Sequence, residues 1–218
     1  MQDVHNDNFV VSPLALSSIL GVIRSGALDE TAQEIKISLN YPQNPKEMET
    51  LISATVPRLK KSKNIHYLSS MKIFLDNQYP FRSEFKTLAE TVYEIELDHF
   101  TANTHERAKP LNDFIEAKSE QKIDGFIKDK DIDPSSMMVL VCAVYCKIRW
   151  SKFHKDASKK RTFKVAPMKD VNVEFLERCG LFNYCESDVL KAQVLELPLE
   201  VKFLYLILVL PRDENGLD

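Results

Sequence analysis

Glycine is scarce in this chain, with only five among its 218 residues. Loops that cradle nucleotide phosphates need closely spaced glycines, and the sequence contains neither a Gly-x-Gly-x-x-Gly run nor a Walker-type run. It also lacks His-Glu-x-x-His, Gly-x-Ser-x-Gly and Cys-x-x-Cys. We therefore predict that the chain is not an enzyme, has no catalytic residue and uses no cofactor.

Histidine is also infrequent, and its positions form no pattern that would indicate a general acid or base. We interpret each one as structural or exposed. A catalytic cysteine–histidine pair stays open as an alternative, because such partners need only be close in space. The five histidines are His5, His66, His99, His105 and His154.

The four cysteines all lie in the second half of the chain and match no zinc-binding spacing. They are Cys142, Cys146, Cys179 and Cys185. We expect unpaired thiols and no metal site. Metal or thiol chemistry at the Cys142 and Cys146 pair is kept as an alternative hypothesis, which bound zinc or a thiol of low pKa would support.

Long hydrophobic runs and an excess of one charge are absent as well. The formal net charge is −3, and no apolar run reaches the length of a membrane span. We therefore expect no nucleic-acid or membrane partner, and favour proteins as partners. Residues 1–8 are polar and lack the order of a signal peptide, and no asparagine is followed two positions later by Ser or Thr.

The most hydrophobic part of the chain is the stretch from Met138 to Trp150. Its first nine residues are apolar and rich in β-branched types, which favours a strand covered on both faces. We expect this strand at the centre of a sheet. Cys142 and Cys146 share one of its faces, and Trp150, the single tryptophan, follows the strand.

The first half of the chain alternates helix and strand patterns. Ser12-Pro13 is a helix-start signal, Gly26 fits a left-handed helix end, Thr31 with Glu34 has capping-box spacing, and Pro57 predicts a kink or an early helix end. The expected elements are a strand at 8–11, helices at 14–25, 31–41 and from 45, a strand at 65–75, a helix at 81–92, a strand at 95–100 and a surface helix from Pro110.

Beyond Trp150 the pattern is entirely β. The last of the strands, Phe203 to Leu210, is apolar throughout, so we expect it to need cover on both faces. Together the two halves predict an α+β fold with mostly antiparallel sheets. The strand candidates are 161–165, 171–176, 180–184, 193–197 and 203–210.

A basic cluster falls at the end of the expected third helix. It consists of Arg58, Lys60, Lys61 and Lys63. Such a cluster could bind a polyanion such as a sulfated glycan. We favour a solvated helix end, because Pro57 and the position of the cluster at the helix end count against a dedicated site.

Several of these segments, in order, resemble the serpin family of serine protease inhibitors. The stretch from Asn8 to Leu16, with Gly26-Ala27 after it, is similar to the family's helix B, and 31–35 resembles the start of helix C. Asn112-x-Phe114-Ile115-Glu116-x-x-Ser119-x-x-Lys122-Ile123 is similar to the helix F signature. Other matches are Val139 to Lys147 with Trp150 (third strand of sheet A), Gly180 to Tyr184, Val194 to Pro198, and Ile207 to Pro211.

The resemblance implies one serpin-like domain, residues 1–218, with sheets A, B and C and helices B to F. It also implies truncation at both ends, since the reactive-centre loop and the C-terminal strands have no match here. A full-length member would inhibit a serine or cysteine protease, and the family tendency indicates an extracellular protein. We expect residues 1–218 not to inhibit by themselves.

The resemblance also assigns site residues. Ser12, Ala15 and Cys142 correspond to the shutter, a polar cluster beneath the strands of sheet A, and Trp150 corresponds to the breach. The family usually has a second serine at position 15 and an asparagine at position 142, so hydrogen bonds worth about 0.5–1.5 kcal/mol each are lost. Two hypotheses follow, an inhibitor whose machinery lies outside these residues, and a truncated, non-inhibitory binding protein.

Overall fold

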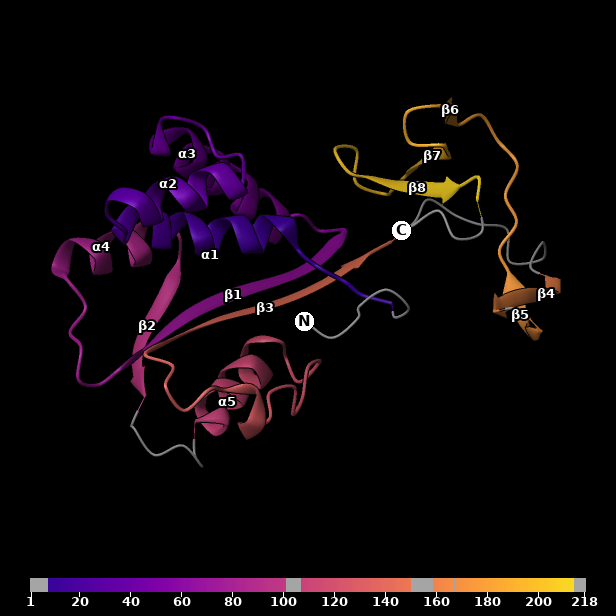
Figure 1. Cartoon of the computed structure of the whole chain (residues 1–218). Coiled ribbons are helices and arrows are strands. Elements are labelled where there is room, and N and C mark those ends of the chain that lie inside the picture. Colours follow the sequence, from indigo (N-terminus) through magenta and orange to yellow (C-terminus); the bar gives the residue numbers. More distant parts are fainter. Residues whose placement is uncertain (1–7, 101–106, 150–158, 167, 214–218) are drawn as a thin grey trace. The chain divides into compact units, whose positions relative to one another are not determined.

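The computed structural model describes residues 8–100, 107–149, 159–166 and 168–213. The chain divides into two compact units, of which the first spans Asn8–Lys147 and the second contains Ile148–Asp218. Figure 1 shows helices and strands in the first unit and strands in the second. We describe each unit by itself, and the expectation of a single domain stays a prediction.

The first unit is built on a three-stranded sheet of order β2-β1-β3. Its strands are β1 (Ile65–Asp76), β2 (Ile95–Phe100) and β3 (Met138–Ile148). β1 and β2 are parallel, with Met71 opposite Ile95. β1 and β3 run in opposite directions. The N–H of Asp76, the last residue of β1, donates to the carbonyl of Met137, just before β3, and the ring of His66, near the start of β1, contacts that of Tyr145, near the end of β3.

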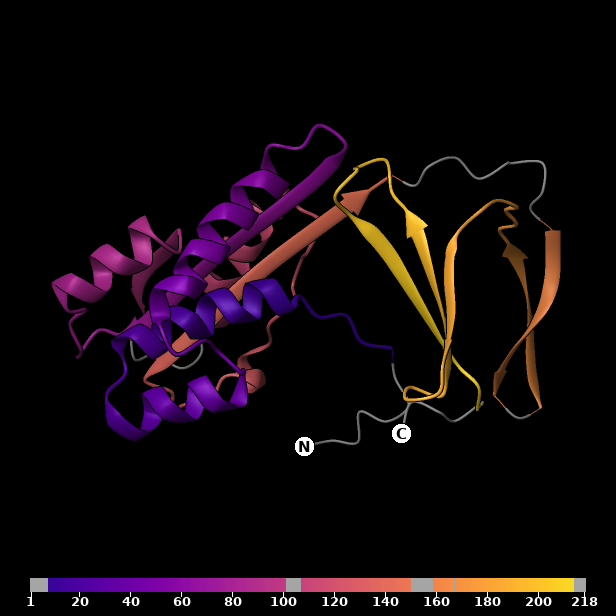
Figure 2. The same ribbon diagram turned by 90° about the horizontal axis from the view of Figure 1, so that it is seen from above.

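Helices cover both faces of this sheet. Figures 1 and 2 show α1 to α4 together on one side of the strands, and Figure 1 shows α5 on the other side. β1 alternates accordingly, with Ile65, Tyr67, Ser69, Met71 and Ile73 buried, as its sequence pattern predicted. The helices are α1 (Pro13–Gly26), α2 (Asp29–Ser38), α3 (Pro45–Lys60), α4 (Ser83–Thr91) and α5 (Ala108–Lys118).

Under α5 lies a separate hydrophobic cluster that joins the helix to all three strands. Phe74, Phe100 and Val141 come from the sheet, and Leu111 and Phe114 come from the helix. The expected surface helix is therefore amphipathic, with one face packed into a core and the other exposed. A short 3₁₀ turn, Asp129–Asp131, interrupts the charged connection between α5 and β3.

The expected central position of β3 is wrong for the part of the chain that the structure describes. There β3 has one partner, β1, and it lies at the edge of the sheet. Val141 and Ala143 are buried, whereas Cys142 and Cys146 are exposed. The buried residues Val141 and Ala143 lie on one face of the strand, and no described strand pairs with its outer edge.

Three further expectations about local structure are wrong. Residues 8–11 form no strand, and Val10 is 98% exposed. Gly26 is not in the left-handed conformation, because it is the last helical residue of α1. A Cβ on Gly26 would lie 2.6 Å from the Phe85 ring. Pro57 does not end α3 early, since the helix continues to Lys60, and the alternative of a kink stays a prediction. α2 begins at Asp29, so Thr31 is inside the helix and does not cap it.

The second unit contains a hairpin and a separate antiparallel sheet. β4 (Lys159–Ala166) pairs with β5 (Lys169–Phe175), with Phe163 opposite Val171. The sheet has the order β6-β7-β8, with strands β6 (Asn183–Ser187), β7 (Ala192–Pro198) and β8 (Tyr205–Pro211). All five strands were expected, but β6 begins at Asn183 and not at Gly180.

β8 is the clearest departure from expectation in this unit. Its sequence predicted cover on both faces, yet Ile207, Leu208 and Val209 are 49%, 44% and 53% exposed. It pairs only with β7 among the described residues, so one edge is also open.

None of the helices in the described part of the chain is long and apolar enough to cross a membrane.

Candidate functional site

The start of α1 is the local structure that organises the candidate site. Ser12 is extended at the N-cap, and its Oγ accepts a hydrogen bond from the Ala15 N–H at 3.3 Å. Pro13 occupies the first turn, where its missing N–H costs no helical bond. The helix start predicted from Ser12-Pro13 is therefore confirmed, and it fixes the position of the Ala15 carbonyl.

β3 brings Cys142 to this helix start. The Cys142 thiol donates a hydrogen bond to the Ala15 carbonyl oxygen, with sulfur and oxygen 3.7 Å apart. The structure thus places Ser12, Ala15 and Cys142 together, although 127 positions separate the last two. Their shutter role stays a prediction, and Trp150, the expected breach residue, lies outside the described residues.

The Cys142 sulfur is partly removed from water, although the residue as a whole is exposed. Burial raises the pKa of the Cys142 thiol to about 11 and also raises the pKa of Cys146. Both thiols therefore stay protonated at neutral pH, which makes them poor nucleophiles and poor metal ligands. Within the described residues no group of three His, Cys, Asp or Glu side chains could hold a metal ion.

Tyr67 on β1 is a polar member of this site that sequence reasoning missed. Its hydroxyl is buried and, among the described residues, makes no hydrogen bond of regular geometry, although the Ser69 side chain is close to it. Burial raises the pKa of Tyr67, the Ser69 side chain opposes this change, and the nearby Cys146 and Cys142 raise the pKa further. The strand pattern placed Tyr67 on the covered face, but only tertiary structure could place it beside thiols from β3.

The basic cluster lies where the sequence placed it, at the C-terminal end of α3 and just beyond it. Lys60 pairs with Glu94 at 2.7 Å, and Lys61 and Lys63 are exposed. Arg58 is exposed but has an interaction of its own. Since one of the four cations is neutralised by a carboxylate, the geometry supports a solvated helix end. Polyanion binding at this cluster has no support from these contacts.

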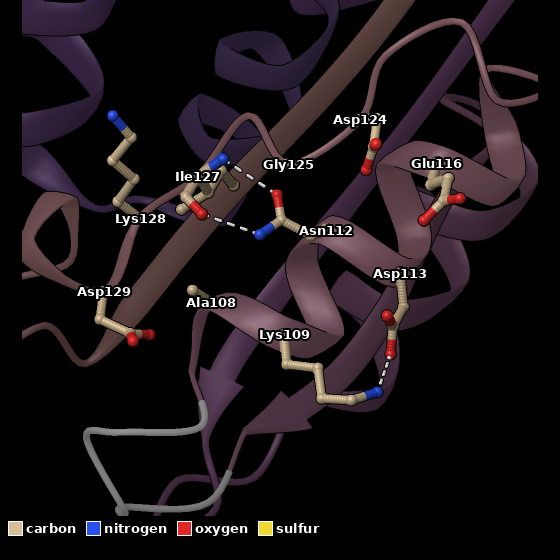
Figure 3. A pocket seen from close by; sticks show the side chains of 10 residues that line it. All are labelled: Ala108, Lys109, Asn112, Asp113, Glu116, Asp124, Gly125, Ile127, Lys128 and Asp129. Atoms are coloured by element: carbon tan, nitrogen blue, oxygen red, sulfur yellow. Dashed lines mark hydrogen bonds and ion pairs between the residues drawn. The ribbon is translucent and has the colours of Figure 1, made fainter.

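A cleft of about 530 Å³ lies between α5 and residues 124–129 (Figure 3). Asn112 spans it, because its Nδ2 donates to the Ile127 carbonyl at 2.8 Å and its Oδ1 accepts from the Ile127 N–H at 2.9 Å. Lys109 pairs with Asp113 on the helix side. Among the residues that the structure describes, no histidine, cysteine or serine lines the cleft. Asn112 therefore acts there as a clamp that ties the connection to the helix.

The sequence matches known proteins over almost all of its length. A family model described as Serpin (serine protease inhibitor) matches residues 1–218. Human serpin B3 is 27% identical over 232 residues, which cover 97% of this chain and 59% of that protein. Serine protease inhibitor 42Dd of Drosophila melanogaster is 28% identical over 216 residues, which cover 97% of this chain and 58% of that protein.

Solved structures share the fold. The crystal structure of Serpin48 from the insect Tenebrio molitor superposes with a TM-score of 0.84 at 25% identity, over 96% of this chain and 58% of that one. The chain thus spans a little under three fifths of the length of each of these three proteins. Because the family model covers the entire sequence, the chain belongs to the serpin family.

Proposed function

We propose that residues 1–218 are the scaffold portion of a serine protease inhibitor and that they have no enzymatic activity. The observation that carries this proposal is the family match over the whole chain, with named protease inhibitors among the relatives. The partner of the complete inhibitor would be a serine or cysteine protease, acting in the extracellular space. Nucleic acid and membrane are not part of the proposal.

The mechanism proposed for the family requires a cleaved loop to join a sheet, so strands on either side must be able to separate. In this chain Ser12, Ala15 and Cys142 are the groups that would hold α1 against β3 during such a change. A thiol–carbonyl bond at 3.7 Å is weaker than an amide–carbonyl bond. We therefore propose a shutter that opens more easily than one with an amide at position 142.

We can assign no counterpart of the reactive-centre loop among residues 1–218, so inhibition should require further chain. The test is a chimera in which residues 1–218 are joined to the C-terminal part of the 42Dd inhibitor, compared with residues 1–218 alone. The chimera should form an SDS-resistant complex with a serine protease, and residues 1–218 should not. A folded chimera that fails to form the complex, or a complex with residues 1–218 alone, would overturn the proposal.

A second candidate, a non-inhibitory binding protein, is favoured by the altered shutter at Ala15 and Cys142. This reading requires residues 1–218 to close their own core. Heat or urea unfolding followed by circular dichroism distinguishes the two, because a sharp transition supports an independent binding protein. Broad melting or aggregation would contradict an independent binding protein. It would indicate that the exposed apolar surface of β8 needs cover from another segment.

A further inference from the structure

The turn after α5 has an unusual residue at its critical position. The Gln121 N–H donates to the Glu116 carbonyl at 2.9 Å, which closes the last turn of α5 in the Schellman pattern. Glu120 takes the left-handed position of that pattern, with φ of 52°, and Gln121 follows with φ of 59°. Glycine is the usual residue there because a Cβ disfavours this conformation. A glutamate at this position is strained, and a contact made by its side chain can offset part of that cost.

The compensating interaction comes from β1. Oε2 of Glu120 lies 3.2 Å from Nε2 of His66. On its other side His66 meets the ring of Tyr145 from β3 edge-on, with ring centroids 5.3 Å apart. Glu120 and Tyr145 are thus established contacts of the His66 side chain within the described residues. The contact therefore joins the α5 turn to the two neighbouring strands.

The same turn is held at other points by groups that do not titrate near neutral pH. Lys118, at the end of α5, pairs with Glu96 on β2. The Ile123 N–H donates to Oγ of Ser119, which is buried, at 3.1 Å. The His66–Glu120 contact is thus the one attachment of this turn in the described structure whose charge changes between pH 5 and 8.

We propose that His66 and Glu120 form a pH-sensitive latch that holds the turn after α5, residues 119–123, against β1. Histidine is the side-chain type whose charge ordinarily changes between pH 5 and 8, whereas a carboxylate ordinarily stays charged across that range. The contact is an ion pair when the imidazole carries its second proton. Without that proton the contact is a hydrogen bond between a neutral ring and a carboxylate, which holds the turn less tightly.

Hydrogen exchange on residues 1–218 tests the latch at the amides that the turn protects, those of Gln121 and Ile123. Rates are corrected for intrinsic exchange and expressed as protection factors at pH 5.5 and pH 7.5. A half-exposed ion pair should change local protection by about two- to fivefold, with the higher value at pH 5.5. The Ile73 amide, in the middle of β1, should show no such change and serves as an internal reference.

Variants separate the latch from other effects of pH. His66→Gln and Glu120→Gln should each abolish the pH difference, and both replace side chains that are half exposed, 44% and 57%, so the fold should tolerate them. His99→Gln, at the other histidine of the described residues, should keep the difference. Glu120→Gly should also remove the difference, and it should raise protection at pH 7.5, where the latch is weaker and the relief of the left-handed backbone dominates.

Two results would overturn the latch. One is equal protection of the Gln121 and Ile123 amides at the two pH values in the unmodified chain. The other is a pH difference that persists in both His66→Gln and Glu120→Gln. This inference does not depend on the proposed inhibitory function, because it concerns local exchange within the first unit.

Discussion

The Cys142 thiol and the Ala15 carbonyl oxygen are hydrogen-bonded across 127 positions of sequence. This bond connects the first turn of α1 to the middle of β3. It links a helix start that the sequence predicts clearly to a strand whose neighbours the sequence cannot specify. The contribution of this bond to stability and the protonation state of the Cys142 thiol can both be measured.

Removing the thiol should destabilise the first unit. We expect Cys142→Ala to lower the free energy of unfolding by about 0.5–1.5 kcal/mol, since the hydrogen bond to Ala15 is lost. Urea unfolding followed by circular dichroism measures the change. Cys185→Ala is the matched control, because Cys185 is exposed on β6, and it should change stability by less than about 0.5 kcal/mol. Equal effects of the two variants would contradict the role of the bond.

The Cys142 thiol should react slowly with alkylating agents. Its pKa is raised to about 11, so at pH 8 the thiolate fraction is on the order of a hundredfold below that of an ordinary cysteine. Iodoacetamide labelling followed by peptide mass spectrometry measures the rate at each cysteine. The Cys142 rate should keep rising up to about pH 11, and labelling at pH 8 as fast as at Cys185 would refute the raised pKa.

Stability should fall at alkaline pH because of buried phenols. Burial raises the pKa values of Tyr41, Tyr67 and Tyr93 above the usual value of 10. Above about pH 10 the unfolded state therefore binds fewer protons than the folded state, and the free energy of unfolding decreases as the pH rises. Urea midpoints at pH 8, 9.5 and 10.5 measure the effect, with absorbance at 295 nm reporting ionisation. A midpoint that stays constant to pH 10.5 would contradict it.

Gly26 is required for close packing between α1 and α4. A Cβ at this position would lie 2.6 Å from the Phe85 ring, so Gly26→Ala should cost about 1–3 kcal/mol through overpacking. Thermal unfolding of the two single variants and of the double variant Gly26→Ala with Phe85→Leu completes a mutant cycle. The smaller leucine should recover part of the loss, and strictly additive effects would show that Phe85 is not the cause.

Local patterns in the sequence predicted most of the elements. Alternation in residues 65–75 predicted β1 and its buried face, and the i, i+3, i+4 spacing from Phe81 to Val92 predicted α4. Ser12-Pro13 predicted the helix start that carries the candidate site. These signals are local, since backbone preference and side-chain spacing within one element decide them. The ordered family signatures likewise depend on sequence alone, and the family match confirms them.

Tertiary structure decided what depends on distant neighbours. The apolar runs of β3 and β8 indicated cover on both faces, but cover requires strands or helices from elsewhere, and composition cannot show whether they are present. α1 ends at Gly26 as the sequence indicated, but the residue is not left-handed, and only the tertiary structure shows the Phe85 ring where a Cβ would lie. The contacts of Cys142 with Ala15 and of His66 with Glu120 join segments far apart in sequence. Such contacts arise when the chain folds back on itself, so no local pattern encodes them.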